Sequence, residues 1–471
     1  IVGASHVSPD PDVLAGRSVD HTGRYRGRAA VLVRPGSTEQ VAAVVRLASS
    51  AGLPVTARGA GTGLAGGAIA AGGGIMIALT RMTRILEVNE RDRYAIVEPG
   101  VVNLDLSLLT SPLGYFFAPD PSSQRACTIG GNVANNSGGP HCLKYGVTLN
   151  HILGLEVVLP SGEIVWTGGA VPDVPGIDLT GVLVGSEGTL GIVTKIMARL
   201  TPNPEAINVL LAAFPSLDAA SRTVSAVIAA GLLPAAMEMM DALTIQAVEA
   251  AYHAGYPLDA AAVLLIELDG LREVVEESSR IVAGICREHD ALDVRVATTQ
   301  AERDLLWQGR KAAFGAMGRL APNYYLPDTV VPRTKLPATL PYLDEISKDY
   351  GLPIANVFHA GDGNLHPLIL FDRYQAGHIE RVLRAGTDLI EWCIAAGGAI
   401  SGEHGIGLEK KDYMTRMFTT DDLAAMAGLK LSFDPLQRFN PDKVFPTGFS
   451  CGEVAALKEQ VARPGASVGG V

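Results

Sequence analysis

Cysteine is scarce in this chain and never closely spaced. Disulfide-rich scaffolds, cysteine zinc sites and iron–sulfur clusters all need cysteines at short, repeated spacings. The sequence therefore argues against all three, and any electrons that the protein handles must leave through a group that these cysteines do not hold. The five cysteines form no Cys-x-x-Cys pair: Cys127, Cys142, Cys286, Cys393 and Cys451.

Long basic runs and long helical apolar runs are also missing. The 471 residues include 38 basic and 49 acidic side chains, for a formal net charge of −11. That balance argues against a nucleic-acid surface or a polybasic membrane patch. The uncharged stretch between Arg58 and Arg81 contains eight glycines, which disfavours a membrane-spanning helix. We expect small molecules or proteins as partners, no nucleic acid, no transmembrane segment, and a cytoplasmic protein that meets a membrane only through a partner.

The composition of the chain and its predicted secondary structure change near residues 201–204, Thr-Pro-Asn-Pro. Before this point, glycine-rich loops alternate with short strand-like runs; after it, alanine-rich helical stretches alternate with strands. A chain of this length is expected to form more than one core. The sequence predicts an α+β protein with domains at 1–203 and 204–400 and a C-terminal segment at 401–471.

Periodicity and capping predict the main elements. Ser37 and Gln40 have the spacing of a capping box before an apolar stripe that ends near Gly52, which predicts a helix. Beyond residue 204, strands are predicted at 209–214 and 262–268, and helices at 216–230, 240–252, 271–290, 301–320, 336–350 and 377–396.

Two histidines flank a tight polar turn within residues 356–371. If residues 361–364 form the loop of a β-hairpin, His359 faces His366, and both imidazoles project from one face about 5 Å apart at Cβ. Such a pair favours a bound metal. The alternative is ordinary turn chemistry beside two unrelated histidines.

A second polar motif, residues 401–407, places Glu403 next to His404 between glycines. The carboxylate offers a hard oxygen ligand and the imidazole a titratable base. Two imidazoles and one carboxylate suit zinc, manganese or iron(II) and leave a coordination position open for substrate. Arg310, on a predicted helix, either holds a substrate carboxylate or lies on a solvated face.

The glycine-rich loop at 59–67 has several interpretations. It matches the Rossmann pattern Gly-x-Gly-x-x-Gly, but the three consecutive glycines within 68–74 disfavour the helix that a Rossmann unit needs. It is otherwise a structural turn or a cradle for a diphosphate. Further small-residue loops at 120–123, 130–139 and 185–191 adjoin strands, and together they favour one long cofactor.

Taken in order, the motifs resemble a family of flavoproteins. They are similar to those of the FAD-linked subunit of bacterial glycolate oxidase and, more broadly, of the D-2-hydroxy-acid dehydrogenases in the vanillyl-alcohol-oxidase superfamily, which include D-lactate dehydrogenases. The resemblance runs from about residue 30 to 446. The motifs that carry it are residues 58–67, 119–123, 128–139, 141–146, 185–191, 359–367 and 401–407.

The resemblance implies a two-lobed FAD-binding domain of the vanillyl-alcohol-oxidase type, an α+β cap domain, and a helical C-terminal segment that returns to the FAD site. It implies non-covalent FAD, because no histidine occurs between Arg58 and Gly67. The cofactor-binding residues that it implies are Arg58, Gly59, Gly61, Thr62 and Gly63 in the pyrophosphate loop, and Asp120, Ser123, Gly130, Gly131, Gly138, Glu187 and Ile192 around the flavin.

The resemblance also implies the chemistry. His359, His366 and Glu403 correspond to the ligands of a divalent metal, for which zinc is the first candidate. His404 corresponds to the catalytic base and is expected to be neutral before substrate binds. The expected reaction oxidises a small D-2-hydroxy acid to the 2-oxo acid, with hydride transfer to FAD. Leu326 and Leu368 stand where D-2-hydroxyglutarate dehydrogenases have a lysine and an asparagine, which favours a small or apolar substrate such as glycolate or lactate.

Electrons must then leave reduced FAD. We expect a separate iron–sulfur subunit, a quinone or a cytochrome as acceptor rather than NAD, and a possible homodimer. Two alternatives stay open at this stage: a non-catalytic flavin-binding subunit of a larger complex, and a flavin-dependent transferase of the same fold, such as alkylglycerone-phosphate synthase.

Overall fold

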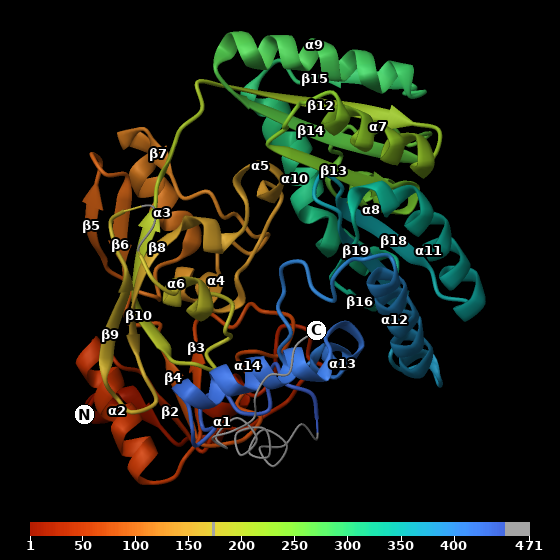
Figure 1. Ribbon diagram of the computed structural model, residues 1–471. Helices are drawn as coiled ribbons and strands as arrows, with labels where there is room; N and C mark the ends of the chain where they lie inside the picture. Colours follow the sequence, from red (N-terminus) through yellow and green to blue (C-terminus); the bar gives the residue numbers. More distant parts are fainter. Residues whose placement is uncertain (172–174, 448–471) are drawn as a thin grey trace, which may run out of the picture.

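The structure is a computed structural model that describes residues 1–171 and 175–447. The end of the C-terminal segment expected at 401–471 therefore lies outside the described residues. Figure 1 shows a first lobe in red to yellow and a second lobe in green to teal, with the blue C-terminal helices beside the first.

A small sheet at the start of the first lobe carries the predicted helix on its face. Strands β2 and β3 run parallel to β4, and β1 pairs antiparallel at the edge. Helix α2 begins after Ser37, whose side chain accepts the N–H of Gln40, so the predicted helix is confirmed. The elements are β1 (Val7–Ser8), α1 (Pro11–Ala15), β2 (Val31–Val33), α2 (Thr38–Ser50), β3 (Val55–Arg58) and β4 (Ile75–Ala78).

The connection from β3 to β4 contains no helix. A Rossmann unit needs a helix directly after its glycine loop, so this interpretation of residues 59–67 is excluded. Gly61 and Gly66 instead take φ angles of 77° and 74°, a region that side chains rarely adopt. The loop therefore keeps an irregular path that only glycine allows.

A second, antiparallel sheet completes the first lobe, in the order β5-β6-β10-β8-β9. Its core is formed by buried side chains such as Leu155 and Ile196. The elements are β5 (Ile85–Asn89), β6 (Tyr94–Val97), α3 (Asn103–Thr110), β7 (Tyr115–Phe116), α4 (Ile129–Asn135), α5 (Cys142–Tyr145), β8 (Ile152–Val158), β9 (Ile164–Gly168), α6 (Leu179–Leu183), β10 (Ile192–Arg199) and β11 (Thr201–Pro202).

The second lobe is an eight-stranded antiparallel sheet covered on both faces. Alternate residues of one strand point to opposite faces, so Leu210 joins the helix-covered core on one face of the sheet, while Leu211 joins the core on the other face. The order is β15-β12-β14-β13-β18-β19-β16, with β17 also on β19. The strands are β12 (Ala206–Phe214), β13 (Ala236–Asp241), β14 (Ala262–Gly270), β15 (Asp293–Val296), β16 (Asn323–Tyr325), β17 (Thr329–Val330), β18 (Ile354–His359) and β19 (Asn364–Phe371).

The helices of this lobe confirm most of the predicted elements, with one error. A helix was expected from residue 240, but β13 runs to Asp241, and α8 begins after it. The strand was missed because its sequence, Ala-Met-Glu-Met-Met-Asp, has no β-branched or aromatic residue. The helices are α7 (Leu217–Ala229), α8 (Ala242–Tyr252), α9 (Arg272–Glu288), α10 (Gln300–Ala316), α11 (Leu336–Tyr350) and α12 (His378–Ala395).

The predicted histidine hairpin exists, but the partner of His359 differs from the predicted one by two residues. His359 pairs with Asn364, and His366 lies opposite Val357. The loop closes earlier than expected because the N–H groups of Asp362 and Gly363 both bind the carbonyl of His359. Since residues two apart on a strand share a face, the imidazoles still project from the same side, diagonally rather than directly opposite.

The C-terminal segment returns to the first lobe. After α13 (Met414–Met417) and α14 (Thr420–Phe433), the chain runs beside β3, where the N–H of Val55 binds the carbonyl of Arg438 and the N–H of Asn440 binds the carbonyl of Val55. Among the described residues, no helix is both long and apolar enough to cross a bilayer.

Candidate functional site

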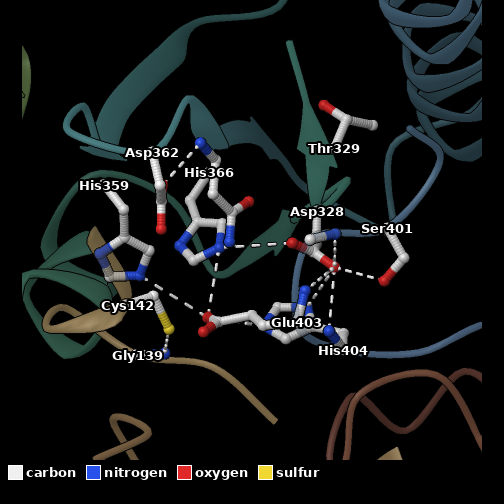
Figure 2. A network of polar contacts seen from close by, with 12 residues as sticks. Gly139, Cys142, Asp328, Thr329, His359, Asp362, His366, Ser401, Glu403 and His404 are labelled. Atoms are coloured by element: carbon white, nitrogen blue, oxygen red, sulfur yellow. Dashed lines mark hydrogen bonds and ion pairs between the residues drawn. The ribbon is translucent and has the colours of Figure 1, made fainter. Parts of the chain in front are cut away.

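Three predicted side chains meet where the second lobe faces the C-terminal segment. His359 ends β18, His366 lies in β19, and Glu403 follows α12 in the chain. Glu403 Oε1 lies 3.7 Å from His359 Nε2 and 3.3 Å from His366 Nε2. Figure 2 shows dashed lines from both rings to this carboxylate, and the ring centroids are 4.9 Å apart.

These three residues fit a divalent metal. His359 Nε2, His366 Nε2 and Glu403 Oε2 are buried, and none has a hydrogen-bond partner. Buried polar atoms are costly unless they are paired, and a cation would satisfy all three. Ligand atoms of the three side chains lie within 4.8 Å of one another, and no other such group occurs among the described residues.

Glu238 lies behind the cluster and was missed by the sequence analysis. Its carboxylate oxygens both lie 2.9 Å from His359 Nδ1, an arrangement that leaves Nε2 free for a metal. Burial opposes a charge on His359, but the carboxylates of Glu238 and Glu403 outweigh it and hold the pKa of His359 well above its usual range. An acidic residue within an apolar run of methionines was the available signal.

Arg310 is buried rather than solvated. Only 1% of its side chain is exposed, and Nη2 lies 2.5 Å from Glu238 Oε2. Its Nε has no hydrogen-bond partner, so the guanidinium keeps donors for a ligand. The interpretation that Arg310 lies on a solvated face is therefore wrong. Arg310 is buried, and Glu238 links it to His359 of the cluster.

His404 lies beside the cluster as predicted. Its ring stacks on His366 with centroids 5.4 Å apart, and its Nε2 is 3.5 Å from Glu403 Oε1. Burial opposes the charged form, but Asp328 and Glu403 raise the pKa of His404. This direction runs against the neutral resting state that we expected; a cation on Glu403 would act in the opposite direction, because like charges disfavour an imidazolium.

Asp328 is the second residue that the sequence analysis missed. It is fully buried, its Oδ2 binds the loop that carries Glu403 and His404, and its Oδ1 lies 3.5 Å from His366 Nε2. Burial opposes its charge, but Lys410 and His404 hold the pKa of Asp328 well below its usual range. An acidic residue inside an otherwise uncharged extended run, Tyr-Tyr-Leu-Pro-Asp-Thr-Val-Val, was the available signal.

The glycine loops of the first lobe lie against one another. A Cβ on Gly59 would meet Thr128 Oγ1 at 2.4 Å, and a Cβ on Gly67 would meet Glu187 Oε2 at 3.3 Å. The N–H of Gly185 binds the carbonyl of Val133. The loops expected to wrap one cofactor are therefore neighbours in space.

One of these loops reaches the cluster. A Cβ on Gly138 would lie 3.0 Å from Glu403 Oε2, and one on Gly139 would lie 2.6 Å from the carbonyl of Asp120. Gly63, in the first loop, has open space where its side chain would be. The glycine-containing segments of the first lobe thus reach as far as Glu403, which fits a long cofactor such as FAD.

The other expected cofactor residues have varied surroundings. The Arg58 side chain folds over Gly61 and donates to the carbonyl of Ala68. The carboxylate of Glu187 is engaged with backbone N–H groups of residues 406 and 407, and the side chain of Ile192 lies in the core. Thr62 and Ser123 lie within loops. Gly130 and Gly131 instead lie in the first turn of helix α4, which Thr128 caps by accepting the N–H of Gly131, so the loop expected at 130–139 begins with a helix.

His141 joins the two lobes at the edge of this region. Its Nδ1 lies 2.8 Å from Asp120 Oδ2 in the first lobe, and its Nε2 lies 3.1 Å from Glu267 Oε1 in the second. Trp307 Nε1 donates to the other oxygen of Glu267 at 2.6 Å. Lys144 and Tyr145 add contacts to a single carboxylate, that of Asp269.

Two family models match the chain. The first, described as FAD binding domain, matches residues 29–168. The second, described as FAD linked oxidases, C-terminal domain, matches residues 203–444. The boundary between them falls where the chain passes from the first lobe to the second.

Curated relatives cover nearly the whole chain. The glycolate oxidase subunit GlcD of Escherichia coli strain K12 is 45% identical over 438 residues, which are 93% of this chain and 88% of the relative. GlcD of Bacillus subtilis is 41% identical, covering 92% and 93%. The D-lactate dehydrogenase of Anaerostipes hadrus is 35% identical, covering 89% and 90%.

Solved structures share the fold at low identity. p-Cresol methylhydroxylase with substrate bound superimposes with a TM-score of 0.80 at 17% identity, covering 95% of this chain and 96% of that one. 4-Ethylphenol oxidase from Gulosibacter chungangensis gives a TM-score of 0.76 at 19% identity, with 95% of each chain covered. The expected vanillyl-alcohol-oxidase type of fold is confirmed.

Proposed function

Because the chain belongs to the family of FAD-linked oxidases, we propose that it oxidises a small D-2-hydroxy acid, of the glycolate or D-lactate type, to the 2-oxo acid. The observation that carries the proposal is the set of unpartnered ligand atoms on His359, His366 and Glu403, next to His404 and at the end of the glycine loops. The named relatives are glycolate oxidase subunits and D-lactate dehydrogenases, and both names refer to 2-hydroxy acids.

The residues of the chain divide the work. When bound, FAD supplies a hydride acceptor and a divalent metal supplies a Lewis acid. His359, His366 and Glu403 would hold the metal, for which zinc is the first candidate and manganese or iron(II) are alternatives. Three protein ligands would leave coordination positions open for substrate oxygens. His404, which is 3.5 Å from Glu403, would accept the proton of the substrate hydroxyl.

Arg310 is proposed to bind the substrate carboxylate. Its guanidinium is held at one end by Glu238, and its Nε has no protein partner. An arginine in this state can donate a charge-assisted hydrogen bond from Nε to a carboxylate. The proposed role therefore needs Glu238 as the group that orients the guanidinium.

The wall near His366 is apolar, which supports a small substrate. The Phe314 ring lies 5.9 Å from His366, and Leu368 is fully buried in the same core, with Leu326 packed against it. A second substrate carboxylate would find no cation at positions 326 or 368, and an unpaired buried charge is costly.

The sequence also bears on how FAD is bound and on where its electrons go. The first glycine loop has no histidine, so FAD is proposed to bind non-covalently. The cysteines offer no cluster-binding spacing, so electrons are proposed to pass to a separate iron–sulfur subunit, a quinone or a cytochrome. A cytoplasmic location, with any membrane contact made through that partner, and a homodimer belong to the same proposal.

The deciding experiment is anaerobic mixing of FAD-loaded, zinc-loaded protein with 2-hydroxy acids while the flavin absorbance near 450 nm is followed. We expect glycolate and D-lactate to bleach the flavin, and L-lactate and D-2-hydroxyglutarate to bleach it far more slowly. Chelation of the metal should stop bleaching while FAD stays bound. If no acid bleaches the flavin with zinc, manganese or iron(II) supplied, the dehydrogenase function is wrong, and the chain is instead a non-catalytic flavoprotein or a flavin-dependent transferase.

A further inference from the structure

The loop of residues 401–407 carries both Glu403 and His404 but belongs to no helix or strand. Its backbone N–H groups therefore need partners outside regular structure. Almost all of these partners are two buried carboxylates that come from different lobes. The loop is bound from both sides.

Asp328 binds the first half of the loop. Its Oδ2 accepts the N–H groups of Gly402, Glu403 and His404 at 3.0, 3.2 and 3.0 Å and the hydroxyl of Ser401 at 2.8 Å. The Nζ of Lys410 lies 3.1 Å from the same oxygen. Three consecutive N–H groups on one charged oxygen fix the direction of the backbone at Glu403 and His404.

Glu187 binds the second half from the first lobe. Its Oε1 accepts the N–H of Ile406 at 2.6 Å, and its Oε2 accepts the N–H of Gly407 at 2.9 Å. From the same lobe, Asn135 Nδ2 donates to the carbonyl of His404 at 2.8 Å. The loop is thus pinned on the side where the glycine loops lie.

The glycines of the loop are explained by these close approaches. A Cβ on Gly402 would lie 2.4 Å from Asn364, and one on Gly405 would lie 2.8 Å from Glu187 Oε1. A Cβ on Gly407 would lie 2.0 Å from the carbonyl of Ala65. Glycine at these three positions therefore leaves room for the neighbouring groups that pack against the loop.

We propose that Asp328 and Glu187 are positioning residues, which set the metal ligand Glu403 and the base His404 from two lobes at once. The proposal rests on the proposed function for the roles of Glu403 and His404. Asp328 Oδ1 also lies 3.5 Å from His366 Nε2, but the positioning role assigned to each carboxylate acts through the backbone that it binds. The site is then complete only when both lobes hold the same loop.

The first test uses metal-free, FAD-loaded protein, so it does not depend on the proposed chemistry. Hydrogen exchange is measured at residue resolution in Asp328→Asn and Glu187→Gln. We expect exchange at Gly402, Glu403 and His404 to be about tenfold faster or more in Asp328→Asn. In Glu187→Gln the acceleration should fall on residues 406 and 407 instead.

Matched controls separate positioning from the general cost of neutralising a buried carboxylate. Asp434 is 1% exposed and, like Asp328, accepts a lysine Nζ (Lys430, 2.6 Å) and a backbone N–H (Phe439, 2.8 Å), but it does not bind the loop. Glu98 is 2% exposed and binds Arg84. Asp434→Asn and Glu98→Gln should leave exchange in the loop unchanged.

The second test measures zinc affinity by competition with a chelator. Asp328→Asn should lose about 10–100-fold in affinity, as for other residues that orient metal ligands, while FAD content stays at the wild-type level. If Asp328→Asn does not fold, Ser401→Ala replaces it, because Ser401 Oγ both donates to Asp328 and accepts the N–H of Gly405; a several-fold loss and faster loop exchange are then expected.

The outcomes distinguish the two proposals. Loop exchange and zinc affinity in Asp328→Asn or Ser401→Ala that equal those of Asp434→Asn overturn the positioning role. A wild-type protein that binds no zinc and is reduced by no 2-hydroxy acid overturns the proposed function instead, and the exchange pattern still decides the positioning of the loop.

Discussion

His404 and the two cluster histidines differ in the charges that surround them. Burial lowers the pKa of His366, whereas carboxylates raise the pKa values of His359 and His404 against the effect of burial. The difference for His359 comes from Glu238, which touches only that ring. His404 Nδ1 has no hydrogen-bond partner and lies 3.8 Å from Asp328 Oδ2, so the ring is held mainly by stacking and by the loop.

Replacing His404 with alanine tests its role at the residue scale. His404→Ala should keep FAD and zinc, because the cluster ligands are intact, and should lose about 10²–10⁴-fold in the rate of flavin reduction, which is typical for loss of a general base. Stopped-flow reduction by D-lactate under anaerobic conditions measures this rate. His21→Ala, at an exposed position, is the control, and an unchanged rate in His404→Ala would remove it from the base role.

At the scale of elements, strand β13 explains why Glu238 stands behind His359. Glu238 and His359 are directly opposite in the antiparallel pair β13 and β18, so their side chains lie on one face. Helix α10 covers that face and places Arg310 on Glu238 and Trp307 on Glu267 of β14. One helix, α10, therefore supplies a partner for each of two buried glutamates on neighbouring strands.

Glu238→Gln should lower the metal affinity of the site, while the second lobe remains folded. The amide keeps one acceptor for His359 but loses the charge that supports the ring and Arg310, so zinc affinity should fall about 10–100-fold. Competition with a chelator measures it. The Michaelis constant for D-lactate should rise at saturating zinc, because Arg310 loses its partner.

Glu98→Gln provides the control for the change in charge and burial. A Glu238→Gln protein with the zinc affinity and Michaelis constant of Glu98→Gln would show that β13 does not contribute to the site.

At the scale of the whole molecule, the site is built from three separate parts of the chain. The second lobe supplies His359 and His366, the C-terminal segment supplies Glu403 and His404, and the first lobe brings Gly138 against Glu403. The lobes are joined beside the site by polar contacts, of which His141 makes one to each lobe. The stability of this junction should therefore depend on pH.

The sign follows from the pKa of His141. Burial opposes its charge, but Asp120 and Glu267 hold the pKa of His141 well above its usual range. A histidine whose pKa is raised by folding contributes stability that is fully present below its unfolded pKa of about 6.5 and is lost as pH rises through the folded value. The junction should be strongest in mild acid.

His141→Gln should therefore lower the melting temperature most at low pH. Loss of hydrogen bonds between charged groups costs about 1.5–3 kcal/mol each, so the difference in melting temperature from wild type should be several degrees near pH 6 and should shrink toward alkaline pH. Thermal unfolding between pH 5.5 and 9.5 measures it, with His21→Gln as the control. A difference that does not change with pH would show that His141 acts only through packing.

Much of the fold and part of the site follow from local pattern. Helix α2 could be predicted from the spacing of Ser37 and Gln40, and the shared face of His359 and His366 from the alternation of a hairpin. The exact register could not, because it depends on which N–H groups bind the carbonyl of His359 within the turn.

The sequence by itself determined which groups are available: two histidines on one face of a hairpin, a glutamate and a histidine side by side, and several loops rich in glycine. These are relations between residues a few positions apart, which the backbone geometry of strands and turns decides. Their chemistry also identified the family, because the motifs occur together in one order.

Only the tertiary structure decided what supports these groups. Glu238 meets His359 across 121 positions of sequence, Asp328 meets His404 across 76, and Glu187 meets Gly407 across 220. No local pattern links such partners, since their contact depends on how β13 pairs with β18 and how the C-terminal loop lies between the lobes. The candidate ligands could be proposed from the sequence, whereas the carboxylates beside them became visible only when the lobes were placed together.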